Sequence, residues 1–299
     1  MTIIHRELEG SNIGAEVCGL DPKHISDEDK TQLQKLFLEY GVLVLRGLDI
    51  DEPTHIELTK IIGEPEIHPV ANIRLERYPE IILLEGGGDT DETAGRNPDD
   101  IVGRIYWHAD LSYTPTLSRG AVLLPKLLPP EGGDTGLVDT VAVYRDLPAG
   151  LKKEIENLEV IHQFDYSDAI KQTRLREAQN PKLTKFPTFP DVAHPLVITH
   201  PESGYKALNI SPMFSCDIVG YEEEQAQALL AKLKAIAVDT KYTYTHHWQM
   251  GDILIWDNWR TCHTATGHKR KFRRKMHRTT LAATDTFGRV DEDRLKASN

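Results

Sequence analysis

Two short segments, far apart in the sequence, together offer the side chains of a metal site. Residues 107–110 read Trp-His-Ala-Asp, and residues 256–263 read Trp-Asp-Asn-Trp-Arg-Thr-Cys-His. They supply two imidazoles, from His108 and His263, and one carboxylate, from Asp110. Two neutral imidazoles and one carboxylate cover one face of an octahedral metal ion and leave the other face open. Such an open face suits oxygen chemistry, whereas a structural zinc site closes its coordination sphere, usually with thiolates.

The spacing of His108 and Asp110 fits this interpretation. Both fall in an expected strand at residues 104–111, where residues two apart point to the same face and can reach one ion. The alternative is coincidence, because the chain has 13 His and a histidine two residues before an aspartate is a weak signal by itself. Cys262 is left out of the ligand set, because it is adjacent to His263 and neighbouring strand residues face opposite sides.

A basic run at residues 269–275 follows the second segment. Such a run is normally a solvated surface, and we expect this of most of it. Arg274 is the candidate exception, because a planar guanidinium that points toward the metal binds a carboxylate through two hydrogen bonds.

Composition sets the class of protein. The chain has 299 residues, of which 39% are hydrophobic and 27% charged, as is ordinary for globular proteins. The formal net charge of −11 argues against general affinity for nucleic acid or an anionic membrane, but not against a local basic pocket. Three scattered cysteines predict no disulfide framework. With no apolar signal core and no segment of membrane-spanning length, the sequence predicts a cytoplasmic protein.

Periodicity predicts a few helices among many short strands. Helices are expected at residues 26–40, where Ser26 and Asp29 form a capping box, at 54–62 and at 221–238. Strands are expected at residues 41–47, 81–85, 104–111, 119–125, 158–164, 194–199, 205–210, 243–248, 252–256 and 276–284. This pattern predicts a mainly β fold of the jelly-roll type with peripheral helices. We expect one domain over residues 1–299.

Two segments of this domain are expected to lie outside its core elements. Residues 86–103, with three successive glycines and acidic neighbours, predict a loop just before the His-x-Asp strand. A long loop beside a site is often a lid, although a plain surface loop is nearly as good an interpretation. Residues 288–299 predict a polar C-terminal tail.

Five motifs, in order, carry a resemblance to a known family. They are Trp-His-Ala-Asp at 107–110, Gly-Gly-Asp-Thr at 132–135, Thr-His-Pro-Glu-Ser-Gly at 199–204, Ile-Trp-Asp-Asn at 255–258 followed by His263, and Arg-Arg-Lys-Met-His-Arg at 273–278. From about residue 19 to residue 287 the chain resembles the taurine dioxygenase (TauD/TfdA) family of Fe(II)- and 2-oxoglutarate-dependent dioxygenases. The resemblance implies a double-stranded β-helix, a cupin-like core that agrees with the strand pattern.

The resemblance also implies roles for individual residues. Thr135 and Arg274 would hold the distal carboxylate of 2-oxoglutarate, and Arg278 would lie near the other end of this cosubstrate or an anionic group of the substrate. The implied Fe(II) ligands are His108, Asp110 and His263. The enzyme would use O2 to hydroxylate a substrate C–H bond while 2-oxoglutarate becomes succinate and CO2. A carbon that carries a sulfonate, sulfate ester or aryl ether would then fragment.

Some of these residues have a plainer interpretation. The alternative for Gly132-Gly133 is a tight turn with no role in the site, which is what glycine pairs usually signify. Trp107, Trp256 and Trp259 are expected in the core rather than as a substrate platform. Four histidines, at positions 246, 247, 268 and 277, are expected to be surface or packing residues.

The implied substrate residues depart from the taurine dioxygenase pattern. The family's His-Pro-Val-Tyr becomes His68-Pro69-Val70-Ala71, which keeps the histidine and loses the tyrosine hydroxyl. An asparagine four residues before the first iron-binding histidine becomes Arg104. Both changes disfavour taurine and indicate a roomier, more positive pocket. Phe214 matches a position that packs against substrate, and Leu111 could extend that apolar wall. A sulfonate, alkyl sulfate, aryloxyalkanoate or other carboxylate is expected as substrate.

Two other function classes remain open from the sequence. One is a non-catalytic binding protein on the same fold. The intact metal triad and Arg274 count against it, because a pure binding protein has no need to keep them. A cupin-like metalloenzyme that uses no 2-oxoglutarate would leave Thr135 and Arg274 without a role. Family members often form dimers or tetramers, so that a homo-oligomer is expected, with neither a nucleic acid nor a membrane as partner.

Overall fold

The computed structural model describes residues 3–9, 11, 13–68, 73–88, 97–168, 170, 171, 175 and 187–297. The chain forms two compact units. Unit 1 comprises Met1–Tyr106, Ser118–Asp139 and Thr240–Ala283. Unit 2 comprises Trp107–Leu117, Thr140–Asp239 and Thr284–Asn299.

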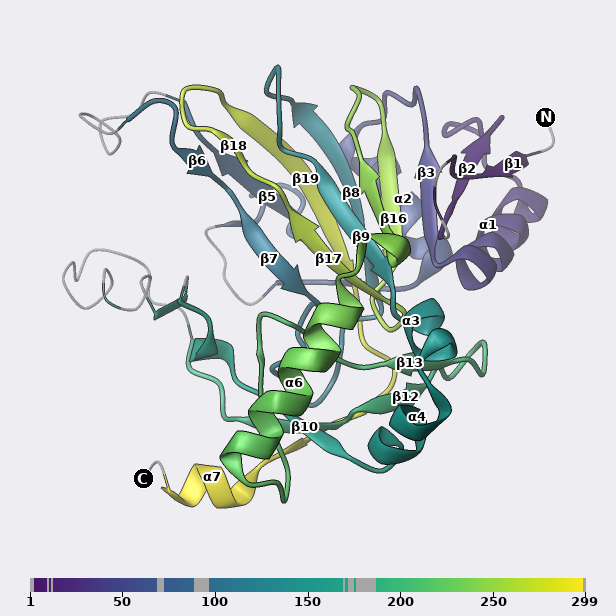
Figure 1. Cartoon of the computed structure of the whole chain (residues 1–299). Helices are drawn as coiled ribbons and strands as arrows, with labels where there is room; N and C mark the ends of the chain where they lie inside the picture. The colour runs from purple at the N-terminus through teal and green to yellow at the C-terminus, as the bar shows by residue number, and fades with distance from the viewer. Residues whose placement is uncertain are drawn as a thin grey trace. The chain divides into compact units, whose positions relative to one another are not determined.

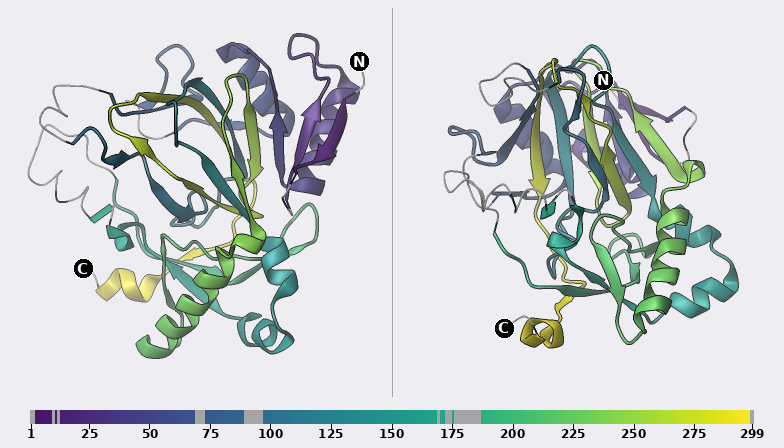
Figure 2. Two further views of the ribbon diagram at one scale, coloured as in Figure 1. Left: turned by 45° about the horizontal axis from the view of Figure 1, so that its top comes forward. Right: turned by 60° about the vertical axis from the view of Figure 1, so that its left-hand side comes forward.

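Unit 1 contains two main sheets of the predicted kind (Figure 1). The first has eight strands, in the order β1 (Ile4–Glu7), β2 (Ala15–Cys18), β3 (Val42–Leu45), β16 (Ile253–Asp257), β8 (Gly120–Leu127), β19 (Arg274–Leu281) and β4 (Pro65–Glu66), with β5 (Ile81–Gly86) also paired to β19. The second has the order β15 (Thr243–His246), β9 (Thr135–Asp139), β17 (Thr261–Ala265) and β7 (Ile105–His108). Figure 2 shows the same sheets from other sides.

Alternating side chains of the larger sheet build two apolar layers. On β16, Ile253 and Ile255 pack with residues of α1 (Asp27–Tyr40) and α2 (Glu52–Ile62). The alternate residues, Leu254 and Trp256, pack with Leu137 of the smaller sheet. Successive strand residues point to opposite faces, so the helices cover one face of the large sheet and the small sheet covers the other. The predicted mainly β double sheet with peripheral helices is confirmed.

The helix predictions in unit 1 are confirmed with small shifts. Ser26 caps α1, and the capping box with Asp29 is present. Asp51 caps α2, which begins two residues before the predicted start and ends before Gly63 as expected. A 3-10 turn, η4 (Thr240–Tyr242), precedes β15. Among the described residues, no helix is long and apolar enough to cross a membrane.

Part of the predicted loop at residues 86–103 is ordered by pairing. β6 (Ile101–Val102) pairs with β18 (His268–Lys269), and Lys271 Nζ lies 2.7 Å from Asp99 Oδ1. Residues 89–96 of this loop lie outside the described residues.

Unit 2 has its own sheets and helices. A four-stranded sheet has the order β14 (Ser215–Ile218), β10 (Glu159–His162), β11 (Val192–Pro195) and β20 (Arg289–Val290), and β12 (Val197–Thr199) pairs with β13 (Lys206–Leu208). The helices are α3 (Thr140–Asp146), α4 (Ala149–Ile155), η3 (Phe164–Tyr166), α6 (Glu223–Ala237) and α7 (Glu292–Ala297). α6 confirms the predicted helix at 221–238. The predicted strand at 194–199 is instead divided between β11 and β12. Leu196 lies between them, and its N–H donates to the carbonyl of Leu158.

Candidate metal centre and cosubstrate site

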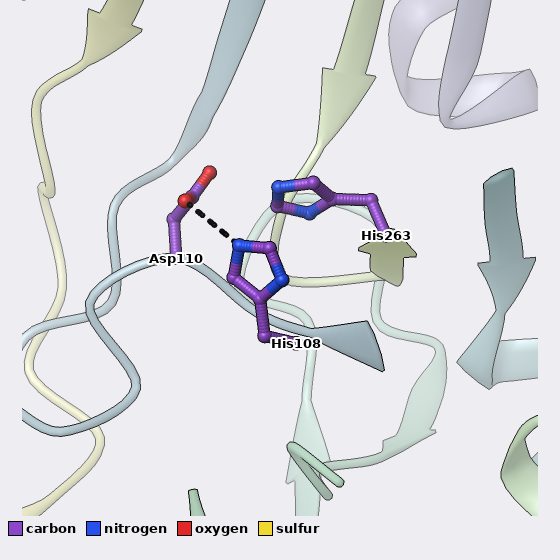
Figure 3. Close-up of side chains that lie close together, drawn as sticks. All are labelled: His108, Asp110 and His263. Carbon is purple, nitrogen blue, oxygen red and sulfur yellow. Dashed lines mark ion pairs between the residues drawn. The ribbon is translucent and has the colours of Figure 1, made fainter. Parts of the chain in front are cut away.

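The side chains of His108, Asp110 and His263 converge (Figure 3). One ligand atom from each residue lies within 4.8 Å of the others, and His108 Nε2 is 3.7 Å from Asp110 Oδ1. Bonds from a transition metal to imidazole or carboxylate are about 2.0–2.2 Å long, so that ligands of one ion lie within about 4.4 Å of one another. The observed spread is close to this limit. Two imidazoles and a carboxylate therefore fit a ferrous ion.

His263 is supported by an aromatic neighbour in unit 1. The residue lies in the middle of β17, and its ring centroid is 4.9 Å from that of Trp256. Trp256 is buried, as expected of a core residue, and the guanidinium carbon of Arg278 lies 5.3 Å from its ring centroid. Burial raises the pKa of the Cys262 thiol to about 12, which keeps it protonated beside the site.

The local geometry of Asp110 differs from the prediction. β7 ends at His108, and Asp110 lies in a turn rather than on a strand. The turn is stabilised by a hydrogen bond of 2.9 Å from Thr114 N to Leu111 O, and Leu111 has a φ of 55°. The predicted strand at 104–111 is therefore wrong beyond His108. The turn that follows includes a left-handed conformation at Leu111, and no glycine signals it in the sequence.

Two buried histidines hold this turn, which comprises residues 109–117. His162 Nδ1 lies 2.8 Å from the carbonyl of Ser112, and His194 Nε2 lies 2.9 Å from that of Thr114. Burial lowers the pKa of His162 to about 3 and that of His194 to about 4, so both rings are neutral near pH 7. The nitrogen that faces each carbonyl must therefore carry the ring proton. Sequence reasoning missed both residues; their position in apolar strand segments was the available signal.

A serine fixes the backbone between the two metal ligands of this segment. The N–H of Ala109 donates to Ser211 Oγ at 3.2 Å, and Ser211 is fully buried. Met213 N also donates to Trp107 O at 3.0 Å. The segment around His108 is thus hydrogen-bonded on both sides of the histidine.

Thr135 is the first residue of β9 and lies between two strands. It pairs with His246 of β15 and with Ala265 of β17, while His263 pairs with Leu137 two residues along. Directly paired residues share a face, as do residues two apart on one strand. Thr135 and His263 therefore project from the same face of the small sheet.

Arg274 is a partly buried cation at the start of β19. Its Nε donates to Gly133 O at 3.1 Å, and Gly133 allows this close approach because a Cβ there would lie 2.9 Å from the same Nε. Burial lowers the pKa of Arg274 to about 10. Among the described residues, no carboxylate forms an ion pair with it. Asp134 attracts the guanidinium at longer range without an ion pair. A desolvated guanidinium of this kind fits a site that receives an anionic ligand.

The residues predicted to bind the substrate differ from one another in burial and in their neighbours. The ring of Phe214 meets that of His108 edge-on at 6.2 Å, and Tyr113 joins Phe214 to Phe164 with centroid distances of 5.0 and 4.6 Å. Leu111 and His68 are partly buried. Arg104 is exposed, and its Nε donates to Thr266 O at 3.2 Å. The predicted residue Ala71 lies outside the described residues.

Comparison with known proteins assigns the family. Residues 5–280 match the model of the taurine catabolism dioxygenase TauD, TfdA family. An alkylsulfatase of Acinetobacter baylyi is 29% identical over 95% of this chain and 86% of its own length. An α-ketoglutarate-dependent 2,4-dichlorophenoxyacetate dioxygenase of a Burkholderia species is 31% identical over 87% of this chain and 86% of its own length.

A solved structure agrees with these matches. The crystal structure of a putative α-ketoglutarate-dependent taurine dioxygenase from Burkholderia xenovorans superposes with a TM-score of 0.77, at 27% identity over 97% of this chain and 92% of that one. The resemblance inferred from the five motifs, the cupin-like fold and the reliance on Fe(II), 2-oxoglutarate and O2 are thereby confirmed. The chain belongs to the TauD/TfdA family and is a 2-oxoglutarate-dependent non-haem iron dioxygenase.

Proposed function

We propose that His108, Asp110 and His263 hold the iron, and that Thr135 and Arg274 bind the distal carboxylate of 2-oxoglutarate. The convergence of the three ligand atoms within 4.8 Å carries the first assignment. Arg274 supports the second: it is partly buried and forms no ion pair among the described residues, and an anionic ligand there would offset the cost of burying the cation. Thr135 shares a sheet face with His263, which supports a role beside the iron.

The protein's part in the reaction is to orient groups and exclude water. When bound, iron and 2-oxoglutarate supply the activation of O2, the hydroxylation of a C–H bond, and the release of succinate and CO2. The turn of residues 109–117 holds Asp110, and Trp256 packs on the ring of His263 so that its orientation is restricted. Arg274 presents its fork to the far end of the cosubstrate, which directs the opposite end toward the metal.

We propose an anionic organic substrate with an apolar body. The aromatic group of Phe214, Tyr113 and Phe164 adjoins His108 and offers ring faces and edges to an aryl or alkyl chain. Arg278 is the cation proposed for the anionic group of the substrate or for the cosubstrate. The names of the two relatives cite alkyl sulfates and 2,4-dichlorophenoxyacetate, both of which combine an anion with an apolar body. Taurine has only a short apolar part.

We also propose a cytoplasmic location. The three cysteines, Cys18, Cys216 and Cys262, are all free thiols. A reducing compartment keeps thiols in this form.

A panel assay of succinate release tests the proposed function. Without a primary substrate, the purified chain with Fe(II), ascorbate, O2 and 2-oxoglutarate should release succinate slowly. An aryloxyacetate or a medium-chain alkyl sulfate should increase the rate roughly tenfold or more, because the aromatic wall binds its apolar body. Taurine serves as the matched anion without that body. A larger stimulation by taurine than by any apolar anion would overturn the substrate proposal.

A further inference from the structure

Trp248 makes a side-chain hydrogen bond to Thr135. Its indole Nε1 lies 3.1 Å from Thr135 Oγ1. Trp248 follows the end of β15 by two residues, and β15 pairs with β9 so that His246 lies directly opposite Thr135. The chain therefore turns back at the end of β15 and places the indole on the hydroxyl of the residue that opens β9.

The chemistry of this contact decides where the Thr135 proton points. An indole N–H is a donor only, whereas a hydroxyl has one proton to donate and two lone pairs to accept. Thr135 Oγ1 must accept from Trp248, and its own proton is left to donate elsewhere. The best acceptor for such a proton is an anionic oxygen, because hydrogen bonds to ionised groups are the stronger ones.

Trp248 is itself held by its neighbours in unit 1. Its ring meets the fully buried ring of His246 edge-on, with centroids 4.5 Å apart, and packs on the apolar layer between the sheets. His246 Nε2 lies 3.1 Å from Asp252 Oδ2, and the same oxygen accepts from Arg46 Nη1 at 2.8 Å. The loop between His246 and Asp252 is thus anchored at both ends.

We propose that Trp248 is a positioning residue for the cosubstrate: it fixes the rotamer and the proton direction of Thr135, so that the hydroxyl donates to the distal carboxylate of 2-oxoglutarate. This inference rests on the proposed role of Thr135. Trp248 touches neither the metal ligands nor, in this account, the cosubstrate, and it acts only through the threonine hydroxyl.

A double-mutant cycle tests the coupling between the two residues. Trp248→Phe removes the N–H and keeps an aromatic ring against His246, and Thr135→Val removes the hydroxyl at equal size. The dissociation constant of 2-oxoglutarate is measured by calorimetry on the whole protein loaded with Mn(II), which binds oxygen and nitrogen ligands without turnover. Mn(II) affinity and the melting temperature are recorded for each variant to detect general disruption.

The expected result is that each single variant weakens 2-oxoglutarate binding roughly tenfold, and that the double variant is no weaker than Thr135→Val alone. Wild-type affinity in Trp248→Phe, or single effects that multiply in the double variant, would overturn the positioning role and leave the proposed function intact. Wild-type affinity in Thr135→Val would overturn the role of Thr135 and this inference with it.

A second measurement does not depend on the folding of Trp248→Phe. In 15N-indole spectra of the wild-type protein and Thr135→Val, one indole N–H should exchange with solvent more slowly in the wild type, because its acceptor is Thr135. Addition of 2-oxoglutarate should slow this exchange further in the wild type and not in Thr135→Val. Identical exchange of all indole protons in the two proteins contradicts the contact.

Discussion

The start of β9 with Thr135 and the turn of residues 109–117 with Asp110 hold proposed site residues by different means. Thr135 lies on a strand with partner strands on both sides. The loop at residues 246–252, which follows the neighbouring strand β15, is anchored by the ion pair of Arg46 with Asp252. Asp110 lies in a turn whose carbonyls face two neutral imidazoles. Thr135, the proposed cosubstrate residue, is thus fixed by sheet register and ionic contacts. Asp110, the proposed metal ligand, is held by uncharged hydrogen-bond donors to the turn in which it lies.

This difference corresponds to a division of labour in the reaction. 2-Oxoglutarate is the same molecule throughout the family, so that a rigid, strand-borne site suits it. The turn carries Leu111 and Tyr113 as well as Asp110, and Tyr113 contacts Phe214, which we propose for the substrate side of the site. The relatives are named for different substrates. Loops that are held by a few donors can change sequence without a change of sheet register.

Within the strand-borne region, the largest effect is expected from Arg274→Gln. Loss of a charge-assisted pair with the distal carboxylate should raise the KM for 2-oxoglutarate roughly 100-fold, with a smaller change in kcat. Steady-state kinetics of succinate release measures both constants.

The adjacent Arg273 provides a matched control, because it is exposed and forms an ion pair with Glu85. Arg273→Gln should leave the KM for 2-oxoglutarate within about twofold, as expected for a surface ion pair. Equal effects of the two substitutions would remove Arg274 from the cosubstrate site.

A moderate effect is expected from His162→Leu in the turn-bearing region. The substitution leaves the buried carbonyl of Ser112 without its donor, which should lower the free energy of unfolding by about 1–3 kcal/mol and weaken Mn(II) binding through Asp110. His162→Asn keeps a donor near the position of Nδ1 and should recover most of both losses. Urea unfolding and metal titration measure them. If asparagine is as harmful as leucine, the hydrogen bond is not what holds the turn.

A further effect separates the two regions by pH. His162 and His194 have folded pKa values of about 3 and 4, below the usual value of 6.5, so that acidification protonates them first in the unfolded chain. Stability should therefore fall as the pH drops from about 6.5 toward 4, by roughly 1 kcal/mol per pH unit for each histidine.

Asp252 should respond later than the histidines. Burial alone would raise its pKa, but contacts with His246, Gln249 N and Arg46 hold the pKa below the usual 3.8. Its contribution to stability is present above that value and is lost only at lower pH. Hydrogen exchange at pH 7 and pH 5 should show a lower opening free energy at pH 5 for amides of residues 112–117, and little change for residues 246–252. A loss of equal size in both regions is the contrary outcome.

The sequence predicted the chemistry of the site better than its geometry. Motifs indicated His108, Asp110, His263, Thr135 and Arg274, which are the residues proposed for iron and 2-oxoglutarate. The residue types of the metal triad and Arg274 suit that chemistry, whereas Thr135 came from the family resemblance. The conformation of Asp110 was not predicted, since the left-handed backbone at Leu111 has no local signal. Trp248, His162 and His194 were missed for another reason: their partners lie 113, 50 and 80 residues away, and only strand pairing brings them together.

The central claim is that the two imidazoles and the carboxylate of Asp110 bind the iron. Its most direct test is the dissociation constant of Mn(II) for Asp110→Ala beside the wild type, with the exposed carboxylate substitution Asp99→Ala as control. Loss of one of three protein ligands should weaken binding roughly 100-fold or more and abolish succinate formation with Fe(II), while Asp99→Ala should bind as the wild type does. Wild-type affinity in Asp110→Ala would contradict the account.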